Sequence, residues 1–217
     1  MNGSEKIMKM LMALLQGSVT TLEVFFLTLL FSLPLAAVIC AGRMSKNKVL
    51  SSFIKFVLMI VRGTPLMLQI ICVYFIPATL FSIKFNRFVA AIVALSINYA
   101  CYFAEIYRAG FESIPHGQYE ACKVLGYTNV QTCFHIICPQ VIKRIVPPMG
   151  NEVMTLVKDT ALVKVISVIE LLSLAEKHSN ALVSIVPLFI AGLFYLVMNG
   201  IVSFGFNKLE RKLSYYK

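Results

Sequence analysis

Long stretches without a charged residue limit most strongly what this chain can fold into. Four intervals contain no Asp, Glu, Lys or Arg: 19 residues between Glu23 and Arg43, 21 between Arg62 and Lys84, 17 between Arg87 and Glu105, and 30 between Lys177 and Lys208. A helix needs about 20 mostly apolar residues to cross a hydrocarbon core of ~30 Å. Charged residues make up 14% of the chain, against roughly a quarter in soluble domains. We therefore expect an all-α integral membrane protein.

The apolar runs predict one transmembrane domain over residues 1–217. Its five spans are expected at about 17–41, 51–82, 87–109, 148–172 and 183–206. The first run has no small-residue cleavage site after it, so we interpret it as a retained helix and not a signal peptide. Gly63 and Pro65 lie within the second span, in RGTPLMLQ (62–69). We expect a break or kink there at membrane depth.

The net charge of +10 is explained by topology and not by nucleic acid. Eleven basic residues fall in segments that we assign to the cytoplasm: Arg43, Lys46, Lys48, Arg108, Lys123, Lys143, Arg144, Lys208, Arg211, Lys212 and Lys217. The other side has five: Lys6, Lys9, Lys84, Arg87 and Lys177. This asymmetry indicates that the N-terminus is outside and the C-terminus is cytoplasmic.

Residues 110–147 form a long polar to amphipathic connection on the basic side. Residues 118–125 favour a short helix, with Gly126 as its left-handed C-terminal residue. Thr128 and Gln131 have the spacing of a capping box, which predicts a second short helix through 132–138. Pro139 disfavours helical geometry at Cys138. Two short helices at the membrane surface would form a docking platform.

Within this connection, EACKVLG (120–126) and IICPQ (136–140) resemble the EAA loop of ABC importer permeases. Glu120, Ala121, Gly126, Ile136 and Pro139 match that pattern, whereas Cys122 and Cys138 replace its second Ala and its Leu. Further stretches resemble the polar amino acid uptake family of these permeases: RGTPLMLQ (62–69), AEIYRAGFESIPHGQYEA (104–121), PPMGNE (147–152) and LVKDTALVKVI (156–166). The resemblance covers about residues 18–206.

The resemblance implies a type I importer permease of the bacterial inner (plasma) membrane. Its partners would be a second permease subunit, identical or related, two cytoplasmic ABC ATPase subunits, an extracytoplasmic amino-acid-binding protein and membrane lipid, with no nucleic acid. Glu120, Ala121 and Gly126 would belong to the coupling helix that docks on the ATPase. The chain contains no GxxxxGK[ST] phosphate loop, so it is expected to be no enzyme itself. It would bind no cofactor, and ATP with Mg would be hydrolysed by the partner.

Ionisable residues at membrane depth are costly and usually face a bundle interior or a water-filled path. Arg62, Glu105 and Asp159, the only Asp of the chain, need such an explanation. A zwitterionic amino acid needs a planar cationic fork for its carboxylate and an acidic acceptor for its ammonium. We therefore predict a midplane substrate site of Arg62, Asn98, Glu105 and Asp159, with a hydroxyl from Thr160.

Structural roles for the same residues stay open. Glu105 and Arg108 are spaced i, i+3 and could pair with each other. Arg62 could bond backbone carbonyls at the helix break, and Lys158 could pair with Asp159 across a dimer interface. The six cysteines include no CxxC pair, so no metal site is expected.

Two other classes of function are weighed against the permease. A self-contained secondary transporter or channel would account for the spans but leave the amphipathic connection unexplained. An intramembrane enzyme is disfavoured because the chain has no HExxH or GxSxG motif. The sequence does not name the amino acid, and basic amino acids, glutamine or glutamate, and cystine all remain open.

Overall fold

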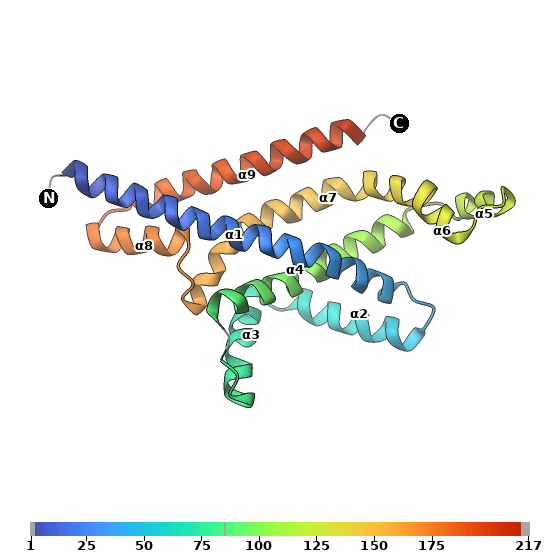
Figure 1. The fold of residues 1–217 in the computed structure, drawn as a ribbon, viewed down its shortest axis with the longest axis horizontal. Coiled ribbons are helices and arrows are strands. Elements are labelled where there is room, and N and C mark those ends of the chain that lie inside the picture. Colours follow the sequence, from blue (N-terminus) through green and yellow to red (C-terminus); the bar gives the residue numbers. More distant parts are fainter. Residues whose placement is uncertain (1–2, 85, 214–217) are drawn as a thin grey trace.

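The fold is described here from a computed structural model, which covers residues 3–84 and 86–213. Every regular element in that part of the chain is helical (Figure 1). In order these elements are α1 (Gly3–Arg43), α2 (Lys48–Gly63), α3 (Leu66–Phe81), α4 (Arg87–Glu112), α5 (His116–Val124), α6 (Asn129–Gln131), a π turn (Thr132–Ile137), α7 (Cys138–Asp159), a 3-10 segment (Thr160–Ile166), α8 (Leu171–Leu182) and α9 (Val186–Leu213). The expected all-α architecture is therefore confirmed.

Within the described part of the chain, three helices are long and apolar enough to cross a membrane: α1, α4 and α9. The expected second span is broken where its sequence predicted. Helix α2 ends at Gly63, α3 begins at Leu66, and the two are bent by 108° relative to each other. Counting this bent pair as one span gives four. The broken span directs α3 away from the bundle in Figure 1.

The expected fourth span, about 148–172, is wrong as a single helix. Helix α7 begins earlier, at Cys138, and ends at Asp159, where the chain turns into the 3-10 segment. Lys158 and Asp159 lie at this helix end, and charged residues at membrane depth usually face a bundle interior or a water-filled path. The chain therefore contains a second discontinuity at Asp159.

The expectation that Pro139 ends a short helix at Cys138 is also wrong. Cys138 has helical φ and ψ of −55° and −43°, and its amide bonds the carbonyl of Cys133 in a π turn. A proline clashes with a helical carbonyl four residues before it, and a π turn adjusts that stretch of helix locally. The second helix of the insert therefore runs directly into α7.

The core lies where α1 packs along α4, with α7 against the same helix. Helix α4 contributes small buried residues to this core, namely Ala90, Ala91, Ala94, Ala100 and Ala104. Small side chains let membrane helices approach closely. Much of the remaining apolar surface faces outward, as a lipid-embedded helix bundle requires.

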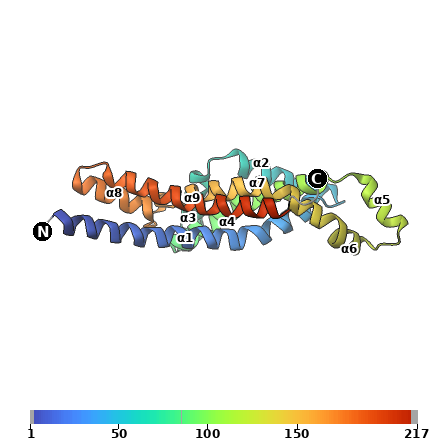
Figure 2. The same cartoon turned by 90° about the horizontal axis from the view of Figure 1, so that it is seen from above.

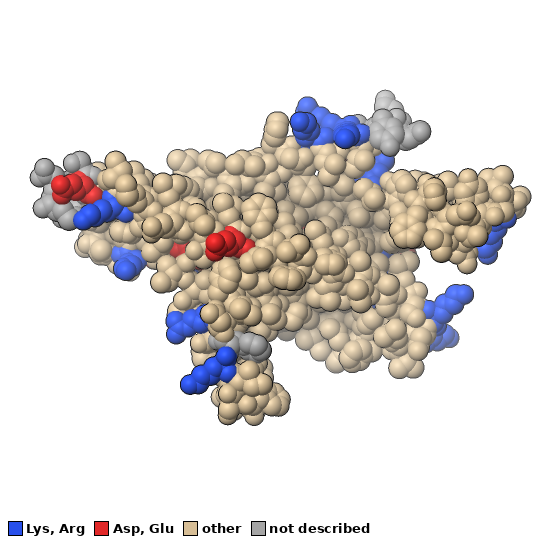
Figure 3. All heavy atoms as spheres, in the orientation of Figure 1, with Lys and Arg blue, Asp and Glu red and all other residues tan. Residues whose placement is uncertain are grey.

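The bundle has two distinct ends. Helices α1, α4, α7 and α9 run lengthwise; α5 and α6 project at one end, and α8 lies beside the start of α1 at the other (Figure 1, Figure 2). On the visible face Lys and Arg lie around the edge of the outline, and the centre of the face is almost free of them (Figure 3). Lys217, part of the expected cytoplasmic set, lies outside the described residues.

Candidate functional site

The break between α2 and α3 is held by the side chain of Gln69. Its Nε2 donates to the carbonyls of Val61 at 2.7 Å and Thr64 at 3.2 Å and to the Thr64 hydroxyl at 2.8 Å. Its Oε1 accepts from Asn98 Nδ2 at 2.9 Å. Gln69 thus satisfies carbonyls that the end of α2 leaves without a helical partner. Asn98, predicted to contact substrate, holds Gln69 in this structure.

Arg62 and Glu105, two of the residues assigned to the predicted substrate site, lie close to each other. Arg62 Nη1 lies 3.9 Å from Glu105 Oε2, and its guanidinium carbon lies 5.1 Å from the ring centroid of Tyr102. The Arg62 side chain is 43% exposed and that of Glu105 is 17% exposed. Asn98, Tyr102 and Glu105 follow one face of α4 at helical spacing. A cation over an aromatic face is favourable, so Tyr102 orients the guanidinium.

Glu105 also pairs with Arg108, the structural alternative that the i, i+3 spacing suggested. Arg108 donates to Glu105 Oε2 from Nη2 at 2.7 Å and from Nε at 3.1 Å, and its Nη1 lies 2.5 Å from Glu112 Oε2. These bonds and the approach of Arg62 all use Oε2. Among the described residues, no donor bonds Oε1 of Glu105, so one carboxylate oxygen is left to accept a further donor.

Asp159 marks the second discontinuity and bonds α4 rather than Lys158. Tyr99 is buried, and its hydroxyl donates to Asp159 Oδ2 at 2.8 Å. The rings of Tyr99 and Tyr102 lie 6.4 Å apart, so α4 links the Asp159 end with the Arg62 end. Thr160 is fully buried, and its hydroxyl donates to the Val157 carbonyl at 2.7 Å.

The two discontinuities meet, because α3 packs against the 3-10 segment that follows Asp159. Transporters build midplane sites from discontinuous helices, whose irregular backbone is tolerated where it lines a cavity or lies inside the protein. Of the five predicted residues, Arg62 and Glu105 face each other, whereas Asn98, Asp159 and Thr160 bond other partners. Substrate contact at all five stays a prediction.

Sequence reasoning missed four interior residues. Three of them, Gln69, Tyr99 and Tyr102, form together with the five predicted residues what is called the interior network below, and the fourth is Glu170. Tyr102 could have been found from its position between Asn98 and Glu105 on one helical face. Gln69 lies in the quoted stretch 62–69, but nothing in the sequence tells that it bonds back to the end of α2. Tyr99 and Asp159 are 60 positions apart, and no local pattern joins them.

Glu170 is a fully buried carboxylate at the start of α8. It accepts from the amides of Leu172 at 2.7 Å and Ser173 at 2.8 Å, and from the hydroxyl of Tyr195 at 2.9 Å. A helix N-terminus stabilises an anion through its free amides and its dipole. Glu170 therefore fixes α8 to α9, and no Lys or Arg of residues 7–84 or 86–213 pairs with it.

The connection between α4 and α7, residues 113–137, is called the coupling insert below. Gly126 has φ of +79°, its amide bonds the Lys123 carbonyl, and the Tyr127 amide bonds the Cys122 carbonyl, both at 3.0 Å. This is the Schellman arrangement that closes a helix, and the predicted left-handed glycine is confirmed. The capping box of Thr128 and Gln131 is confirmed as well.

Few buried contacts attach the coupling insert to the bundle. Ile114, Ile137 and Val141 form a small separate core. Gln140 Nε2 donates to Gln118 Oε1 at 2.6 Å, and Arg144 Nη1 donates to the Ser113 hydroxyl at 2.8 Å. Burial and a hydrogen bond with the Cys133 thiol raise the pKa of Cys138 to about 11. The base of the insert is thus held by this small core and by the two hydrogen bonds to Gln140 and Arg144 of α7.

The tip of the coupling insert is apolar and exposed. Val124 is 88% exposed and Leu125 is 74% exposed, and Val130 and Phe134 on the second arm are also exposed. Glu120 and Ala121 lie on the exposed side of α5. Exposed apolar patches rimmed by polar residues mark interaction surfaces. This end of the molecule can therefore dock another protein.

Comparison with known proteins gives concordant findings. Residues 12–215 match the family described as "Binding-protein-dependent transport system inner membrane component". The chain is 36% identical over 201 residues to an arginine transport system permease protein of Bacillus subtilis, and 30% identical over 201 residues to a putative glutamine transport system permease protein of Rickettsia felis. Each alignment covers 92% of both chains. The crystal structure of an amino acid ABC transporter with histidines superposes with a TM-score of 0.86 at 30% identity, covering 95% of this chain and 96% of that one.

Proposed function

We propose, from the premise that the chain belongs to the family of binding-protein-dependent transport system inner membrane components, that it is the permease subunit of an ATP-driven importer for polar amino acids. Its relatives are amino acid permeases, and its fold is that of a type I importer permease. The sequence contains no GxxxxGK[ST] phosphate loop. ATP, with Mg, would be hydrolysed by a separate subunit, with no cofactor on this chain.

One observation carries the coupling role: the exposed apolar tip of the coupling insert. Val124 and Leu125 flank the turn at Gly126, and their side chains are almost entirely open to solvent. A self-contained secondary transporter would have no use for such a surface, because its driving ions act within the membrane domain. An ATPase groove that accepts a short helix does require it. Glu120, Ala121 and Gly126 are the residues that we assign to this contact.

The interior network suggests how an amino acid would be held. The separation of 3.9 Å between Arg62 Nη1 and Glu105 Oε2 exceeds hydrogen-bonding distance, so the guanidinium is not committed to that carboxylate. Arg62 would take the substrate carboxylate in a bidentate pair. Oε1 of Glu105 would accept the substrate ammonium while Arg108 continues to hold Oε2. These contacts address groups common to all amino acids, so the shape of the path would select the side chain.

The partners beyond the membrane subunit are also part of the proposal. A second permease subunit, identical or related, would pack on apolar surface that one chain leaves open, such as Leu80 and Phe81 on α3. Two ATPase subunits would bind the coupling inserts. An extracytoplasmic binding protein would deliver the amino acid at the opposite end. Lipid would cover the remaining apolar surface, including Phe189 and Phe204 on α9.

For the orientation, we propose that the end carrying the coupling insert is cytoplasmic. The N-terminus would then be outside and the C-terminus inside the bacterial plasma membrane. Lysines at opposite ends provide a matched test, since Lys46 and Lys177 are both exposed. In a cysteine-free background, Lys177→Cys should react with an impermeant thiol reagent in intact cells and Lys46→Cys should not. The reverse labelling pattern would invert the topology.

The function itself is tested by isolation and uptake. The chain, purified with its native partners from the cells that produce it, should co-isolate with an ATP-hydrolysing protein. Proteoliposomes of this complex, supplied with the matching binding protein, should accumulate labelled L-arginine, L-glutamine or L-cystine only with ATP inside. Uptake that follows an ion gradient without ATP would favour the secondary transporter instead.

A further inference from the structure

Two cysteine thiols face each other in the coupling insert and at the start of α7. Cys133 lies in the π turn, Cys138 directly follows it, and their sulfur atoms are 3.6 Å apart. Both residues are partly exposed, whereas Cys40, Cys101 and Cys122 are buried. A disulfide bond is about 2.05 Å long, so the two sulfurs need to approach by only about 1.5 Å to form one.

The π turn is what brings these two residues together. In an α-helix, five positions correspond to a rotation of about 500°, so the two side chains would point about 140° apart. In the π turn the Cys138 amide bonds the Cys133 carbonyl, an i→i+5 bond that widens the helix and brings the two residues to the same side. The backbone adjustment that precedes Pro139 therefore also aligns the two thiols.

The hydrogen bond between the thiols gives them different roles. Burial and this bond raise the pKa of Cys138 to about 11. Cys138 therefore keeps its proton at neutral pH and donates it to the Cys133 sulfur. A hydrogen bond donated to a thiolate stabilises the charged form, and the thiolate is the nucleophile in thiol–disulfide exchange. Cys133 is thus the sulfur that attacks first.

A mostly apolar cavity gives small reagents access to both thiols. It is called the thiol cavity below, and it encloses about 530 Å³ between the end of α1, the end of α4 and the coupling insert. Cys133, Cys138 and Lys123 are among its lining residues, and a nearby ammonium favours a thiolate. Small-molecule sites usually enclose ~300–1,000 Å³, so a low-molecular-weight disulfide can enter.

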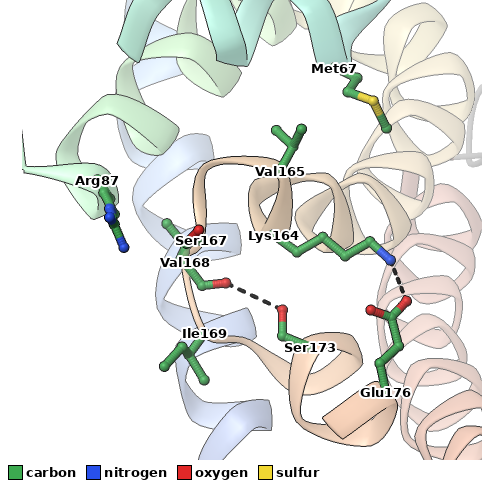
Figure 4. A pocket seen from close by; sticks show the side chains of 9 residues that line it. All are labelled: Met67, Arg87, Lys164, Val165, Ser167, Val168, Ile169, Ser173 and Glu176. Carbon is green, nitrogen blue, oxygen red and sulfur yellow. Dashed lines mark hydrogen bonds and ion pairs between the residues drawn. The ribbon is translucent and has the colours of Figure 1, made fainter. Parts of the chain in front are cut away.

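The cavity drawn in Figure 4 differs from the thiol cavity in its chemistry. Its lining comes from α3, α4, the 3-10 segment with the loop after it, and α8, and its Lys164 and Glu176 already pair with each other. Among the described residues, no cysteine lines it. The thiol cavity, in contrast, presents two groups that can bond covalently to each other once an oxidant enters.

Metal binding explains the thiol pair less well than a disulfide does. Two thiolates alone do not complete the four-coordinate site that zinc requires. In the part of the chain that the structure describes, no group of three or more His, Cys, Asp or Glu side chains could hold a metal ion. His135, in the same turn, contacts the Gln131 carbonyl through Nδ1 at 3.2 Å.

We infer that Cys133 and Cys138 are a modification site that forms a reversible disulfide, with a low-molecular-weight disulfide of the glutathione type as its oxidant. The Cys133 thiolate attacks one sulfur of the oxidant, whose S–S bond breaks and releases one thiolate. Cys138 then gives its proton to a thiolate and attacks the Cys133 sulfur of the mixed disulfide, which releases the second thiol. Two thiols of the chain thus lose two electrons and two protons, and the oxidant is reduced to two thiols.

The disulfide would act on docking, and this consequence rests on the proposed function. Cytoplasmic disulfides are usually transient and redox-sensing. Phe134, next to Cys133, is an exposed apolar residue of the second arm of the coupling insert, and drawing the sulfurs together shifts the turn that carries it. Oxidation should therefore weaken ATPase association by up to about tenfold, the contribution of one apolar side chain at an interface.

The test treats the purified permease–ATPase complex with glutathione disulfide. Trypsin cleavage after Lys123 and Lys143 gives the peptide 124–143, whose only cysteines are Cys133 and Cys138. After denaturation and alkylation with N-ethylmaleimide, this peptide should carry no alkyl group and should be lighter than the reduced, unalkylated peptide by two hydrogen atoms. Dithiothreitol before alkylation should restore both alkylation sites.

Single variants test the assigned order of attack. Cys138→Ser should trap a glutathionyl group on Cys133, because the thiol that displaces it is gone. Cys133→Ser should gain a glutathionyl group on Cys138 more slowly, and the reverse order of rates would overturn the assignment of the attacking sulfur. Cys40→Ser removes another thiol that lines the thiol cavity, and this matched control should form the disulfide as wild type does.

The outcomes separate the disulfide from its alternatives. A wild-type peptide that stays alkylated at both sites, or that retains one glutathionyl group, would overturn the inference. Protection from alkylation that a chelator removes and dithiothreitol does not would assign the pair to metal binding, and would also overturn it.

Association with the ATPase subunit is measured on the reduced and the oxidised complex. The double variant Cys133→Ser/Cys138→Ser should associate equally with and without glutathione disulfide, which shows that cysteines elsewhere are not responsible. Equal association of the reduced and oxidised wild-type complexes would overturn the effect on docking. A reduced wild-type chain that co-isolates with no ATP-hydrolysing protein would contradict the proposed function itself, and the peptide measurement on the chain alone would still decide the disulfide.

Discussion

The interior helix breaks and the tip of the coupling insert differ in whether their unusual residues find partners within the chain. In the interior, Gln69, Asn98, Tyr99 and Asp159 are costly polar groups for a membrane domain, and each is bonded within the chain. At the tip, apolar Val124 and Leu125 are left open to solvent. An unsatisfied polar group in a membrane costs several kcal/mol, and these four side chains find their partners within one subunit. The apolar side chains at the tip are not covered by any other part of the described chain.

The comparison teaches where to look for function in such a chain. Interior polar residues serve first to hold irregular backbone, and only those with uncommitted atoms can also contact substrate. Arg62 and Oε1 of Glu105 meet that condition, whereas Asn98 and Thr160 each already donate a hydrogen bond within the chain, Asn98 to Gln69 and Thr160 to the Val157 carbonyl. At the tip the opposite criterion applies. Apolar residues there indicate a binding surface because they are exposed and no other part of the described chain covers them.

The largest expected effect falls on the tip. Replacing both Val124 and Leu125 by serine should reduce ATPase association about a hundredfold or more, because burying each side chain contributes roughly 1.5–3 kcal/mol at an interface. Quantitative co-purification measures it. Val183→Ser, at an equally exposed apolar residue of the loop between α8 and α9, is the control and should leave association unchanged. Unaltered association in the double variant would remove the tip from the docking surface.

A smaller effect is expected at the first break. Gln69→Ala leaves the carbonyls of Val61 and Thr64 without their donor, which costs about 1–3 kcal/mol of stability. Asn98→Ala should cost less, since Gln69 still bonds the end of α2. Thermal unfolding of the solubilised protein gives both values. If Asn98→Ala instead weakened substrate binding with no change in unfolding temperature, Asn98 would contact substrate as the sequence first suggested.

The smallest expected effect concerns the turn at the tip. Gly126→Val places a branched residue at φ of +79°, which costs about 1–2 kcal/mol, and should weaken ATPase association about five- to thirtyfold. Gly117→Val is the control. A side chain at Gly117 also meets open space, but the φ of this residue lies outside the left-handed range. Equal association of the two variants would show that the shape of the turn is irrelevant to docking.

Local signals allowed part of this structure to be predicted from sequence. Gly63 and Pro65 located the first break, and Gly126 the left-handed end of α5, because each depends on the backbone of a few neighbouring residues. The π turn before Pro139 was missed, since it compensates a proline that would otherwise end the helix. The bond of Tyr99 to Asp159 was missed because only packing of α4 against α7 creates it. Glu170 was missed because a buried carboxylate with amide partners looks in sequence like any surface glutamate.

The central claim is that Arg62 and Glu105 hold the amino acid within the membrane subunit. It is tested most directly by titrating the transported amino acid into the purified permease–ATPase complex without binding protein. Wild type, Arg62→Lys, Arg62→Ala and Glu105→Gln are compared, with ATPase co-purification measured on each. We predict that Arg62→Ala and Glu105→Gln lose about ten- to a hundredfold in affinity, and that Arg62→Lys also loses affinity because it keeps the charge but not the fork. Well-assembled Arg62→Ala and Glu105→Gln complexes that bind the amino acid with wild-type affinity would contradict the account.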